Sequence, residues 1–361
     1  MALFTIKNVR IKGVSASVPE TKVSTYDYDF FSREDAETFI KTVGIESRYV
    51  AQNGECASDL CKLAAENLIQ DLGWEKDSIG ILSFESVTAD YRTPPTSCIL
   101  QDRLGLPSTC MTFDLPMGCC GFLYSVCVVG KMMQTGDVKR AILLIGDTIT
   151  RMGSPKDKSR LPLFGDCGTA VALEYEEGAD DIIIDMNSYG KGFEALITPH
   201  SGFRHQVTPE SFEYEDFGNG VVRAPVHSLI QGMDVFAFAI TRPPKSIKAL
   251  LEQYGVDKDK DIDYFLIHQA NKMIVDKVVK KSGLDLSKTP SNLSKFANLG
   301  GASIPMLMVS EIADDLKNKK LNMMASAFGL GLSWGTMLFK TDKIVVPELA
   351  VYHKEENIKC F

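Results

Sequence analysis

Short apolar segments of strand length, separated by stretches of helix length, most constrain the fold of this chain. In the first half the predicted strands are 79–85, 112–115 and 140–145, and the predicted helices are 96–104 and 119–134. Strands that are apolar throughout and alternate with helices are typical of a largely parallel sheet covered by helices on both faces. The sequence therefore predicts an α/β protein.

The second half of the chain repeats this rhythm. Its predicted strands are 180–186, 263–267, 321–328 and 333–339, and its predicted helices are 234–254, 271–281 and 302–316. The turn-like segment EEGADD near residue 177 divides the chain into two similar halves, 1–176 and 177–361. The polar stretch 190–231, with scattered Gly and Pro, is predicted to be a loop-rich insertion over the surface or over a site.

Charge and cysteine content exclude several classes of function. With a net charge of −8, the chain as a whole repels DNA and anionic membranes. No apolar run reaches the length of a membrane span, and the first residues lack the apolar core of a secretory signal. The nine cysteines show no metal-binding spacing and suit reduced thiols. We therefore expect a cytoplasmic protein with no metal site, no membrane span and no nucleic-acid partner.

The uncharged stretch between Leu115 and Gly130 contains the strongest candidate for a nucleophile. A helix that is apolar on nearly every side is a buried helix. At its first turn, Cys119 is expected to face unpaired backbone N–H groups and the positive dipole end, which favour the thiolate. Cys120 competes for this role, but Gly118 leaves room for a substrate beside Cys119. A simple packing cysteine is the alternative interpretation.

Two further polar segments are candidates for the same site. The predicted strand 263–267 runs directly into His268, and the carboxyl end of a buried parallel strand is where α/β proteins place their sites. Asn298 lies beside two glycines that let the backbone approach a ligand closely. A structural histidine and a turn asparagine are the alternatives. Gly329 and Gly331 predict a hairpin turn whose N–H groups can point into a site.

Together these segments resemble the β-ketoacyl-acyl-carrier-protein synthase III family, condensing enzymes of the thiolase superfamily. The family motif C-x-G-F begins at Cys119, H-Q-A-N covers 268–271, N-x-x-x-A-S-x-P covers 298–305 and G-x-G-x-x-W-G covers 329–335. Further matches are FGD at 164–166 and G-x-D-V-F at 232–236. The order and spacing of the motifs agree over nearly the whole chain.

The resemblance implies a homodimer with the thiolase fold, in which duplicated βαβαβαββ halves form a five-layered αβαβα core. It implies an acyltransferase with a Cys119–His268–Asn298 triad and a ping-pong reaction. The acyl group on Cys119 would undergo decarboxylative condensation with a malonyl thioester, and His268 and Asn298 would donate hydrogen bonds to the enolate. The N–H groups of Cys119 and Leu330 would hold the acyl oxyanion, although the family usually has glycine at the position of Leu330.

The resemblance also implies substrates and partners. Acyl-CoA and malonyl-acyl-carrier-protein would be substrates, and no cofactor would be permanently bound. Phe39, Lys158, Phe236 and Asn271 match positions that contact coenzyme A or pantetheine. Lysines on the helix after His268 would dock the acidic carrier protein, with a solvated helix face as the alternative; these are Lys272, Lys277, Lys280 and Lys281.

Departures from the family pattern bear on the substrate and the pathway. Pro94 stands where the family often has an acyl-pocket Phe, and the arginine of the W-I-x-x-R-T-G-I motif is missing after Phe39. We therefore expect either fatty acid biosynthesis or a specialised acyl or polyketide-type pathway. Acyl transfer to an alcohol or amine without decarboxylation is the alternative function. Hydroxymethylglutaryl-CoA synthase needs an added glutamate base, and Glu85 lies in that region in a poorly matching register.

Overall fold

Two β-sheets organise the chain in the computed structural model, which describes residues 2–354. The six-stranded sheet has the order β17 (Ala350–Tyr352), β2 (Val9–Pro19), β8 (Cys167–Tyr175), β7 (Arg140–Asp147), β5 (Ile81–Glu85) and β6 (Met111–Leu115). The five-stranded sheet has the order β1 (Ala2–Ile6), β9 (Ile182–Ser188), β16 (Ser333–Asp342), β15 (Lys320–Gly329) and β14 (Tyr264–Ile267).

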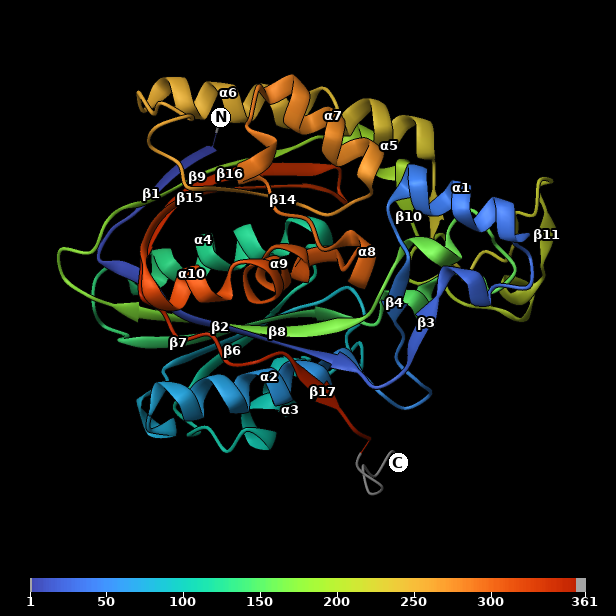
Figure 1. The fold of residues 1–361 in the computed structure, drawn as a ribbon. Helices are drawn as coiled ribbons and strands as arrows, with labels where there is room; N and C mark the ends of the chain where they lie inside the picture. The colour runs from blue at the N-terminus through green and yellow to red at the C-terminus, as the bar shows by residue number, and fades with distance from the viewer. Residues whose placement is uncertain (1, 355–361) are drawn as a thin grey trace.

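Helices form three layers around these sheets, as Figure 1 shows. The middle layer contains α4 (Gly121–Met133), α9 (Ser303–Glu311) and α10 (Ala313–Asn318). The outer layer on the six-stranded sheet is α2 (Ala57–Leu72) and α3 (Thr96–Arg103), and the other outer layer is α5 (Gly232–Ala239), α6 (Arg242–Gln253) and α7 (Lys272–Ser282). The predicted α/β class and five-layered thiolase fold are confirmed.

The central helices are buried because both sheets pack on them. Phe122 of α4 and Met308 of α9 are fully buried in one apolar cluster with Leu143 and Leu266, which come from the two different sheets. The absence of charge between Leu115 and Gly130 thus reflects burial on all sides, as predicted.

The first strand of the chain belongs to the sheet built mainly from the second half of the chain, and the last strand belongs to the sheet built from the first half. β1, at the start of the chain, pairs with β9 in the five-stranded sheet, whereas β17, near the end, pairs with β2 in the six-stranded sheet. The turn near residue 177 links β8 of one sheet to β9 of the other. The division into halves at this turn stays a prediction.

Several element boundaries differ from the expected ones. The single helix predicted at 234–254 is two helices, α5 and α6, because Pro243 and Pro244 occupy the first turn of α6, where a missing N–H breaks no helical hydrogen bond. The helix predicted from residue 119 begins instead with the 3-10 turn η3 (Gly118–Cys120), and α4 follows. The helix predicted at 302–316 is interrupted at Ile312 between α9 and α10.

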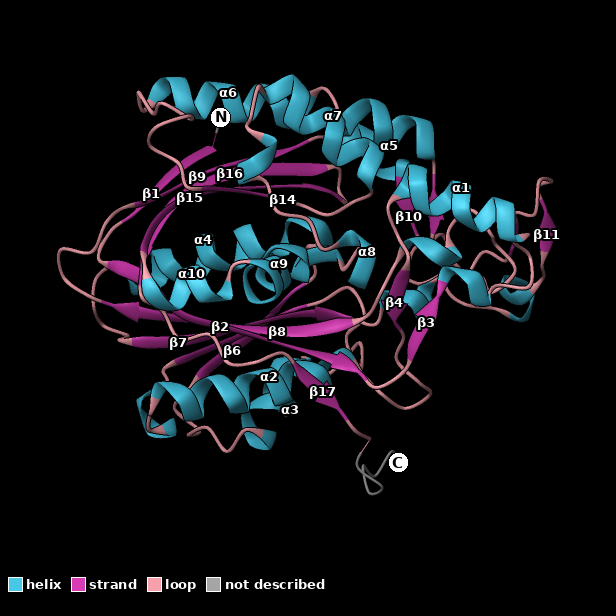
Figure 2. Cartoon of the chain, in the orientation of Figure 1, coloured by secondary structure: helices cyan, strands magenta, loops and turns pink. Residues whose placement is uncertain are grey.

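A smaller lobe flanks the layered core on the side of α1 (Arg33–Val43), with β3 (Lys22–Ser24) and β4 (Ser47–Tyr49) beside it (Figure 2). Much of the stretch 190–231 is loop. Its short strands are β10 (Leu196–Ile197), β11 (Glu215–Asp216), β12 (Val222–Arg223) and β13 (Leu229–Ile230), which pair β10 with β13 and β11 with β12.

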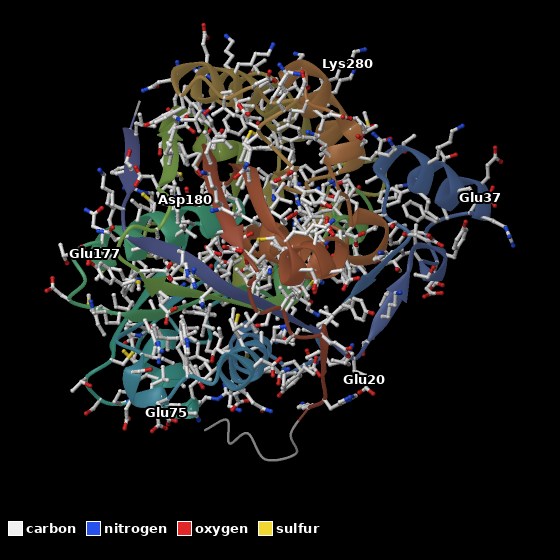
Figure 3. All side chains as sticks on the ribbon, turned by 60° about the vertical axis from the view of Figure 1, so that its left-hand side comes forward. Glu20, Glu37, Glu75, Glu177, Asp180 and Lys280 are labelled. Carbon is white, nitrogen blue, oxygen red and sulfur yellow. The ribbon has the colours of Figure 1, made fainter. Side chains whose placement is uncertain are left out.

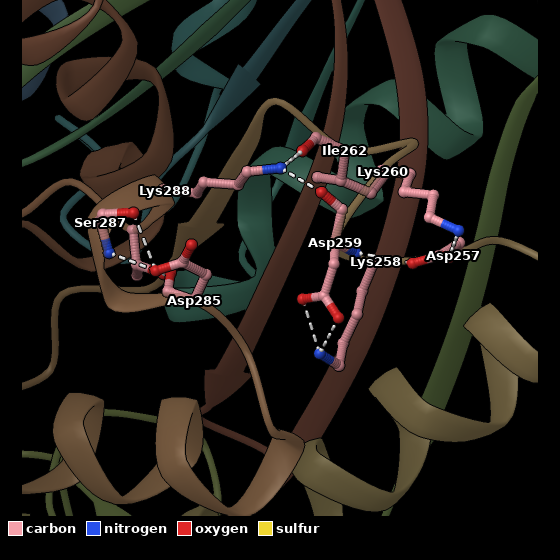
Figure 4. A network of polar contacts seen from close by, with 9 residues as sticks. Asp257, Lys258, Asp259, Lys260, Ile262, Asp285, Ser287 and Lys288 are labelled. Carbon is pink, nitrogen blue, oxygen red and sulfur yellow. Dashed lines mark hydrogen bonds and ion pairs between the residues drawn. The ribbon is translucent and has the colours of Figure 1, made fainter.

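A polar network fixes the loop that leads into β14 (Figure 4). The Lys288 ammonium group donates hydrogen bonds to the carbonyl oxygens of Asp259 and Ile262, both at 2.7 Å. Asp285 accepts hydrogen bonds from the backbone N–H and the hydroxyl of Ser287, both at 2.8 Å. The start of β14, the strand that leads into His268, is therefore held in place.

Candidate active site

Cys119 lies in η3, between the end of β6 and the start of α4, and its side chain is half-buried. It lines a cavity of about 350 Å³. The neighbouring Cys120 is fully buried in the apolar core. Of the two adjacent cysteines, Cys119 is thus the one that faces a cavity.

Glycine is required opposite the Cys119 sulfur. A Cβ atom on Gly329, at the end of β15, would lie 2.5 Å from Sγ, and Gly329 has a φ of +155° that L-residues rarely adopt. The predicted hairpin turn between β15 and β16 thereby brings Leu330 against the sulfur, where its backbone N–H group can donate to Sγ.

Burial raises the pKa of the Cys119 thiol to about 11. The N–H groups of Leu330 and of Cys119 itself lower this pKa, while Asp147 and Glu85 raise it further through their charges. Burial outweighs the backbone donors. The resting form at neutral pH is therefore the thiol, in contrast to the thiolate that the helix position predicts.

His268 follows β14 and is 1% exposed. Its backbone N–H donates to the carbonyl of Ser326 in β15 at 2.9 Å, which fixes the residue beside that strand. The imidazole packs edge-on against Phe328, with 5.4 Å between ring centroids, and Phe328 directly precedes Gly329. His268 and Cys119 thus lie on either side of the last residues of β15.

The His268 imidazole is neutral, because burial lowers its pKa to about 4. Its Nδ1 atom makes no hydrogen bond to any residue within 2–354. A neutral ring with an unused nitrogen can donate or accept a hydrogen bond when a substrate arrives.

Asn298 is held beside the nucleophile turn by its backbone. Its N–H donates to the carbonyl of Leu163 at 3.1 Å, and its carbonyl accepts from the N–H of Gly165 at 3.0 Å. Its side-chain Oδ1 accepts from the N–H of Gly300 at 3.0 Å, so the amide NH₂ faces away from that contact as a donor. Gly300 itself lines the cavity.

The loop of Asn298 packs directly against η3. A Cβ atom on Gly301 would lie 2.7 Å from the carbonyl oxygen of Gly118. Cys119 is the member of the predicted triad that lines the cavity, while Asn298 adjoins it through Gly300, and His268 through Phe328 and Gly329. The segments of Cys119 and Asn298 therefore pack against each other, and the end of β15 connects the surroundings of Cys119 with those of His268.

Glu85 is a buried carboxyl group that the sequence did not assign to the site. It ends β5, is fully buried, and occupies the space where side chains on Gly121 and Gly301 would lie. Burial, followed by the charge of Asp147, raises its pKa well above the usual range. The N–H groups of Gly118 and Met117 approach it and oppose this shift, but neither oxygen has a well-formed hydrogen bond within residues 2–354.

Asp147, at the end of β7, braces the loops around the cavity. Its Oδ1 accepts hydrogen bonds from the Ser86 hydroxyl at 2.9 Å and the Val87 N–H at 2.8 Å. Burial raises its pKa to about 6. Asp147 and Glu85 each lie at the carboxyl end of a parallel strand, and the two strands are adjacent. This position is the sequence signal that could have pointed to both acids.

The walls of the cavity are mainly apolar and come from both halves of the chain. They include Val87, the 3-10 turn η4 (Ile149–Met152), the paired strands β10 and β13, and Phe164. The stretch 190–231 thus covers a site, one of the two predicted possibilities. Arg160, which no sequence argument singled out, is also part of the wall.

The residues predicted to bind coenzyme A lie on elements around this region. Phe39 is a half-buried residue of α1 that packs against Phe31, and Phe236 is a half-buried residue of α5. Lys158 is exposed and its backbone N–H donates to Gly220 of the 190–231 stretch. Asn271 caps α7 by accepting from the N–H of Ile274 at 2.9 Å, which gives it a structural role. Their contacts with a coenzyme stay predictions.

The four predicted docking lysines are exposed on α7, whose opposite face is buried. Lys272 forms an ion pair with Asp276 at 2.6 Å. Lys280 points outward at the molecular surface in Figure 3. Within residues 2–354, Lys277, Lys280 and Lys281 have no ion-pair partner, so their charge is available to a partner.

The described part of the chain offers no group of His, Cys, Asp or Glu side chains suited to holding a metal ion. None of the helices between residues 2 and 354 has the length and apolar character needed to cross a bilayer.

Comparison with known proteins identifies related sequences and structures. Residues 113–192 match the family model 3-oxoacyl-[acyl-carrier-protein (ACP)] synthase III, and residues 251–341 match its C-terminal counterpart. A putative 3-oxoacyl-[acyl-carrier-protein] synthase 3 of Campylobacter jejuni is 32% identical over 96% of this chain and 98% of its own length. The crystal structure of a 3-oxoacyl-(acyl-carrier protein) synthase from Burkholderia xenovorans LB400 has a TM-score of 0.91 and 33% identity, and the match covers 97% of this chain and 99% of that one.

Proposed function

Because the chain belongs to the 3-oxoacyl-[acyl-carrier-protein] synthase III family and is an acyl-transferring condensing enzyme, we propose that Cys119 carries the acyl group during a two-step condensation. In the first step the Cys119 sulfur attacks the carbonyl of an acyl-CoA. The thiol proton leaves with the departing coenzyme thiol, and a new thioester forms on Cys119.

The second step is a decarboxylative condensation. A malonyl thioester loses CO₂, and the electron pair of the broken bond forms an enolate. The enolate carbon attacks the acyl carbonyl, the bond to sulfur breaks, and the departing Cys119 thiolate takes up a proton from solvent to regenerate the thiol. Neutral His268 and the Asn298 amide donate hydrogen bonds to the enolate oxygen, where preorganised donors in a dry site stabilise developing charge strongly.

One observation carries this proposal. The Cys119 sulfur opens on a cavity, the loop of Asn298 packs against the turn of Cys119, and the neutral His268 ring, which has an unused nitrogen, packs on Phe328 beside Gly329. The backbone N–H of Leu330 at the sulfur supports its role, together with the N–H of Cys119, in holding the acyl oxyanion.

Intact-mass measurement after incubation with acyl-CoA tests the roles of the three residues. Cys119→Ala should take up no acyl group, because the sulfur is gone. His268→Ala and Asn298→Ala should still acylate, yet release CO₂ from a malonyl thioester about a hundredfold more slowly, since each removes one enolate donor. Cys98→Ala, which changes an exposed cysteine, and His205→Ala, which changes an exposed histidine, are matched controls.

Two results would contradict the assignment. An acyl adduct on Cys119→Ala would place the nucleophile elsewhere. Unchanged CO₂ release by both His268→Ala and Asn298→Ala would show that these side chains do not stabilise the enolate. Acyl transfer to an alcohol or amine would then be the function to test.

The proposed substrates are acyl-CoA and malonyl-acyl-carrier-protein. The coenzyme would enter past Phe39, Lys158, Phe236 and Asn271, and the carrier protein would dock on the lysines of α7. No permanently bound cofactor is required by these steps. The positive surface of α7 supports docking of an acidic carrier, although the chain as a whole has a net charge of −8.

We also propose a homodimer in the cytoplasm. Cys56 apart, the seven described cysteines have free thiols, which supports a reducing compartment. The open edge of β6 supports pairing with a second copy of the chain. The replacement of an expected acyl-pocket Phe by Pro94 supports a specialised acyl or polyketide-type pathway.

A further inference from the structure

Arg160 is a charged side chain in the wall of the Cys119 cavity. It lies between η4 and the 3-10 turn η5 (Leu161–Leu163) and is 4% exposed. The surrounding wall is made mainly of apolar side chains, among them Ile149 and Phe164. A buried cation in such a wall is unfavourable unless a partner compensates its charge.

Arg160 has no ion pair within the described residues, although the charges of Asp157 and Asp166 favour its charged form from a greater distance. The guanidinium lies over the Phe164 ring, 4.7 Å from its centroid, and Nη2 donates a long hydrogen bond of 3.4 Å to the carbonyl of Ile149. The Nε–H group has no hydrogen-bond partner within residues 2–354. No carboxylate oxygen of the described residues lies within 4.0 Å of its nitrogen atoms, the limit for an ion pair.

The nearest acidic side chains are engaged elsewhere. Asp157 accepts hydrogen bonds from the N–H and the hydroxyl of Ser159 and lies 3.9 Å from Arg223. Asp166 accepts from Thr150 and from the Ala51 N–H. Burial lowers the pKa of Arg160 to about 10, so the guanidinium keeps its charge at neutral pH.

We propose that Arg160 binds a carboxylate at the far end of the starter acyl group, so that the enzyme takes short dicarboxylic half-thioesters such as succinyl-CoA or glutaryl-CoA. The inference rests on the proposed function, because the cavity would hold the acyl chain carried by Cys119. A guanidinium presents two parallel N–H donors that match a carboxylate. Ser201 and Ser228 also line the cavity, but their hydroxyls donate to the carbonyl oxygens of Thr198 and Met152, so the guanidinium is the group that recognises the carboxylate.

The size of the cavity supports a short chain. Its volume of about 350 Å³ lies near the lower end of the range of small-molecule sites, which is roughly 300–1,000 Å³. The strands β10 and β13 close it on one side through apolar residues that suit the methylene groups between the two carboxyl ends.

The test compares acyl groups of equal chain length with and without the second carboxylate. The rate of adduct formation on Cys119 is measured by intact mass with glutaryl-CoA against pentanoyl-CoA, and with succinyl-CoA against butyryl-CoA. The wild-type enzyme should acylate at least about tenfold faster with each dicarboxylic substrate. Arg160→Met should reverse this preference, and Arg160→Lys should show an intermediate preference because its point charge lacks the fork geometry.

Arg151→Met is the matched control, because it removes the same charge from an exposed position in η4 that does not line the cavity. It should keep the wild-type preference. Continued acylation of Arg160→Met by pentanoyl-CoA shows that this variant is folded. If it does not fold, the preferences of the wild type and Arg160→Lys decide the question.

Three outcomes overturn the inference while leaving the proposed function intact. The first is a wild-type preference for the uncharged partner of each pair. The second is an equal loss with both acyl types in Arg160→Met, which indicates a structural role. The third is unchanged dicarboxylic acylation with impaired use of the malonyl thioester, which assigns Arg160 to the second substrate. If no thioester acylates the wild type at all, the proposed function itself fails.

Discussion

Burial shifts three ionisable side chains around the nucleophile toward their neutral forms. The pKa of Cys119 is raised to about 11, that of His268 is lowered to about 4, and that of Glu85 is raised well above the usual range. At neutral pH Cys119 is a thiol and His268 a neutral imidazole, and burial favours the protonated form of Glu85. Neutral donors around the nucleophile can act on the negative charge that develops on the enolate.

Glu85 should make the stability of the protein depend on pH. Its pKa in the folded state lies above the ordinary value of 4.5, so above pH 4.5 the unfolded chain releases a proton that the folded protein retains. Its contribution is fully present below pH 4.5 and is lost as pH rises toward the folded-state pKa. The stability of Glu85→Gln relative to the wild type should therefore increase as pH rises from 5 to 8, because the glutamine side chain does not titrate.

Urea unfolding of both proteins at several pH values measures this difference. Glu177→Gln, in the exposed turn between the two sheets, should leave the pH dependence of the wild type unchanged. A constant difference between Glu85→Gln and the wild type across this range would show that the Glu85 carboxyl ionises normally in the folded protein.

At the scale of single elements, α7 combines a buried face with a positive outer face. Ile274, Val275, Val278 and Val279 pack inward, which leaves the lysines exposed around the helix. Lys272 is paired with Asp276, whereas Lys277 and Lys280 have no ion-pair partner within residues 2–354. This helix begins at Lys272, five residues after the last residue of β14, and directly follows the segment that holds His268.

Charge reversal on α7 tests whether this face binds the carrier protein. The double variant Lys277→Glu/Lys280→Glu should raise the KM for malonyl-acyl-carrier-protein about tenfold, because it replaces attraction by repulsion, while acylation by acyl-CoA stays normal. The control reverses two exposed lysines on the neighbouring helix α6, Lys245→Glu/Lys248→Glu. An equal effect of both double variants would indicate general electrostatics instead of a docking surface.

The elements that sequence patterns predicted well are those whose signal is local. The cores of β5, β7 and β14 are continuous apolar runs, and α4 is recognisable by its lack of charge. The motifs around Cys119, His268 and Asn298 also pointed to the segments that meet in the structure. The single helix predicted at 234–254 was wrong, because the helix pattern was followed through Pro243 and Pro244, which lie in the first turn of α6.

The features that sequence reasoning missed depend on contacts between distant residues. Arg160 reads as an ordinary polar residue in a loop, and only the packing of Phe164 and Gly153 around it makes it a cavity residue. Glu85 ends a predicted buried strand and was set aside because its register matched poorly, yet Gly121 and Gly301 leave space for its carboxyl group in the interior. No pattern in the neighbouring sequence indicates that a single charged side chain is buried.

At the scale of the whole molecule, β6 leaves one edge of the six-stranded sheet open. Its only strand partner among the described residues is β5, and Met111 at its start is 52% exposed. An open edge presents unpaired N–H and C=O groups that another strand can bind. In the proposed homodimer, β6 of each copy would pair with β6 of the other and make one continuous sheet.

Light scattering after size-exclusion chromatography tests this interface. The wild type should have twice the chain mass of 39.8 kDa. Met111→Lys should shift the protein toward the monomer, because a lysine on an edge strand opposes pairing with another strand. Met233→Lys changes a methionine on α5 that is 82% exposed and should leave the dimer intact. A monomeric wild type, or equal behaviour of both variants, would contradict pairing through β6.

The exchange of β1 and β17 between the sheets has a consequence for how the molecule is completed during translation. The six-stranded sheet lacks an edge until residues 350–352 have left the ribosome, although its other strands end by residue 175. A fragment ending near residue 176 would therefore leave β2 without its outer neighbour, and one starting at residue 177 would leave β9 without β1. Each fragment would therefore lack one strand of its sheet. When the two fragments are expressed separately, each should become resistant to proteolysis only in the presence of the other.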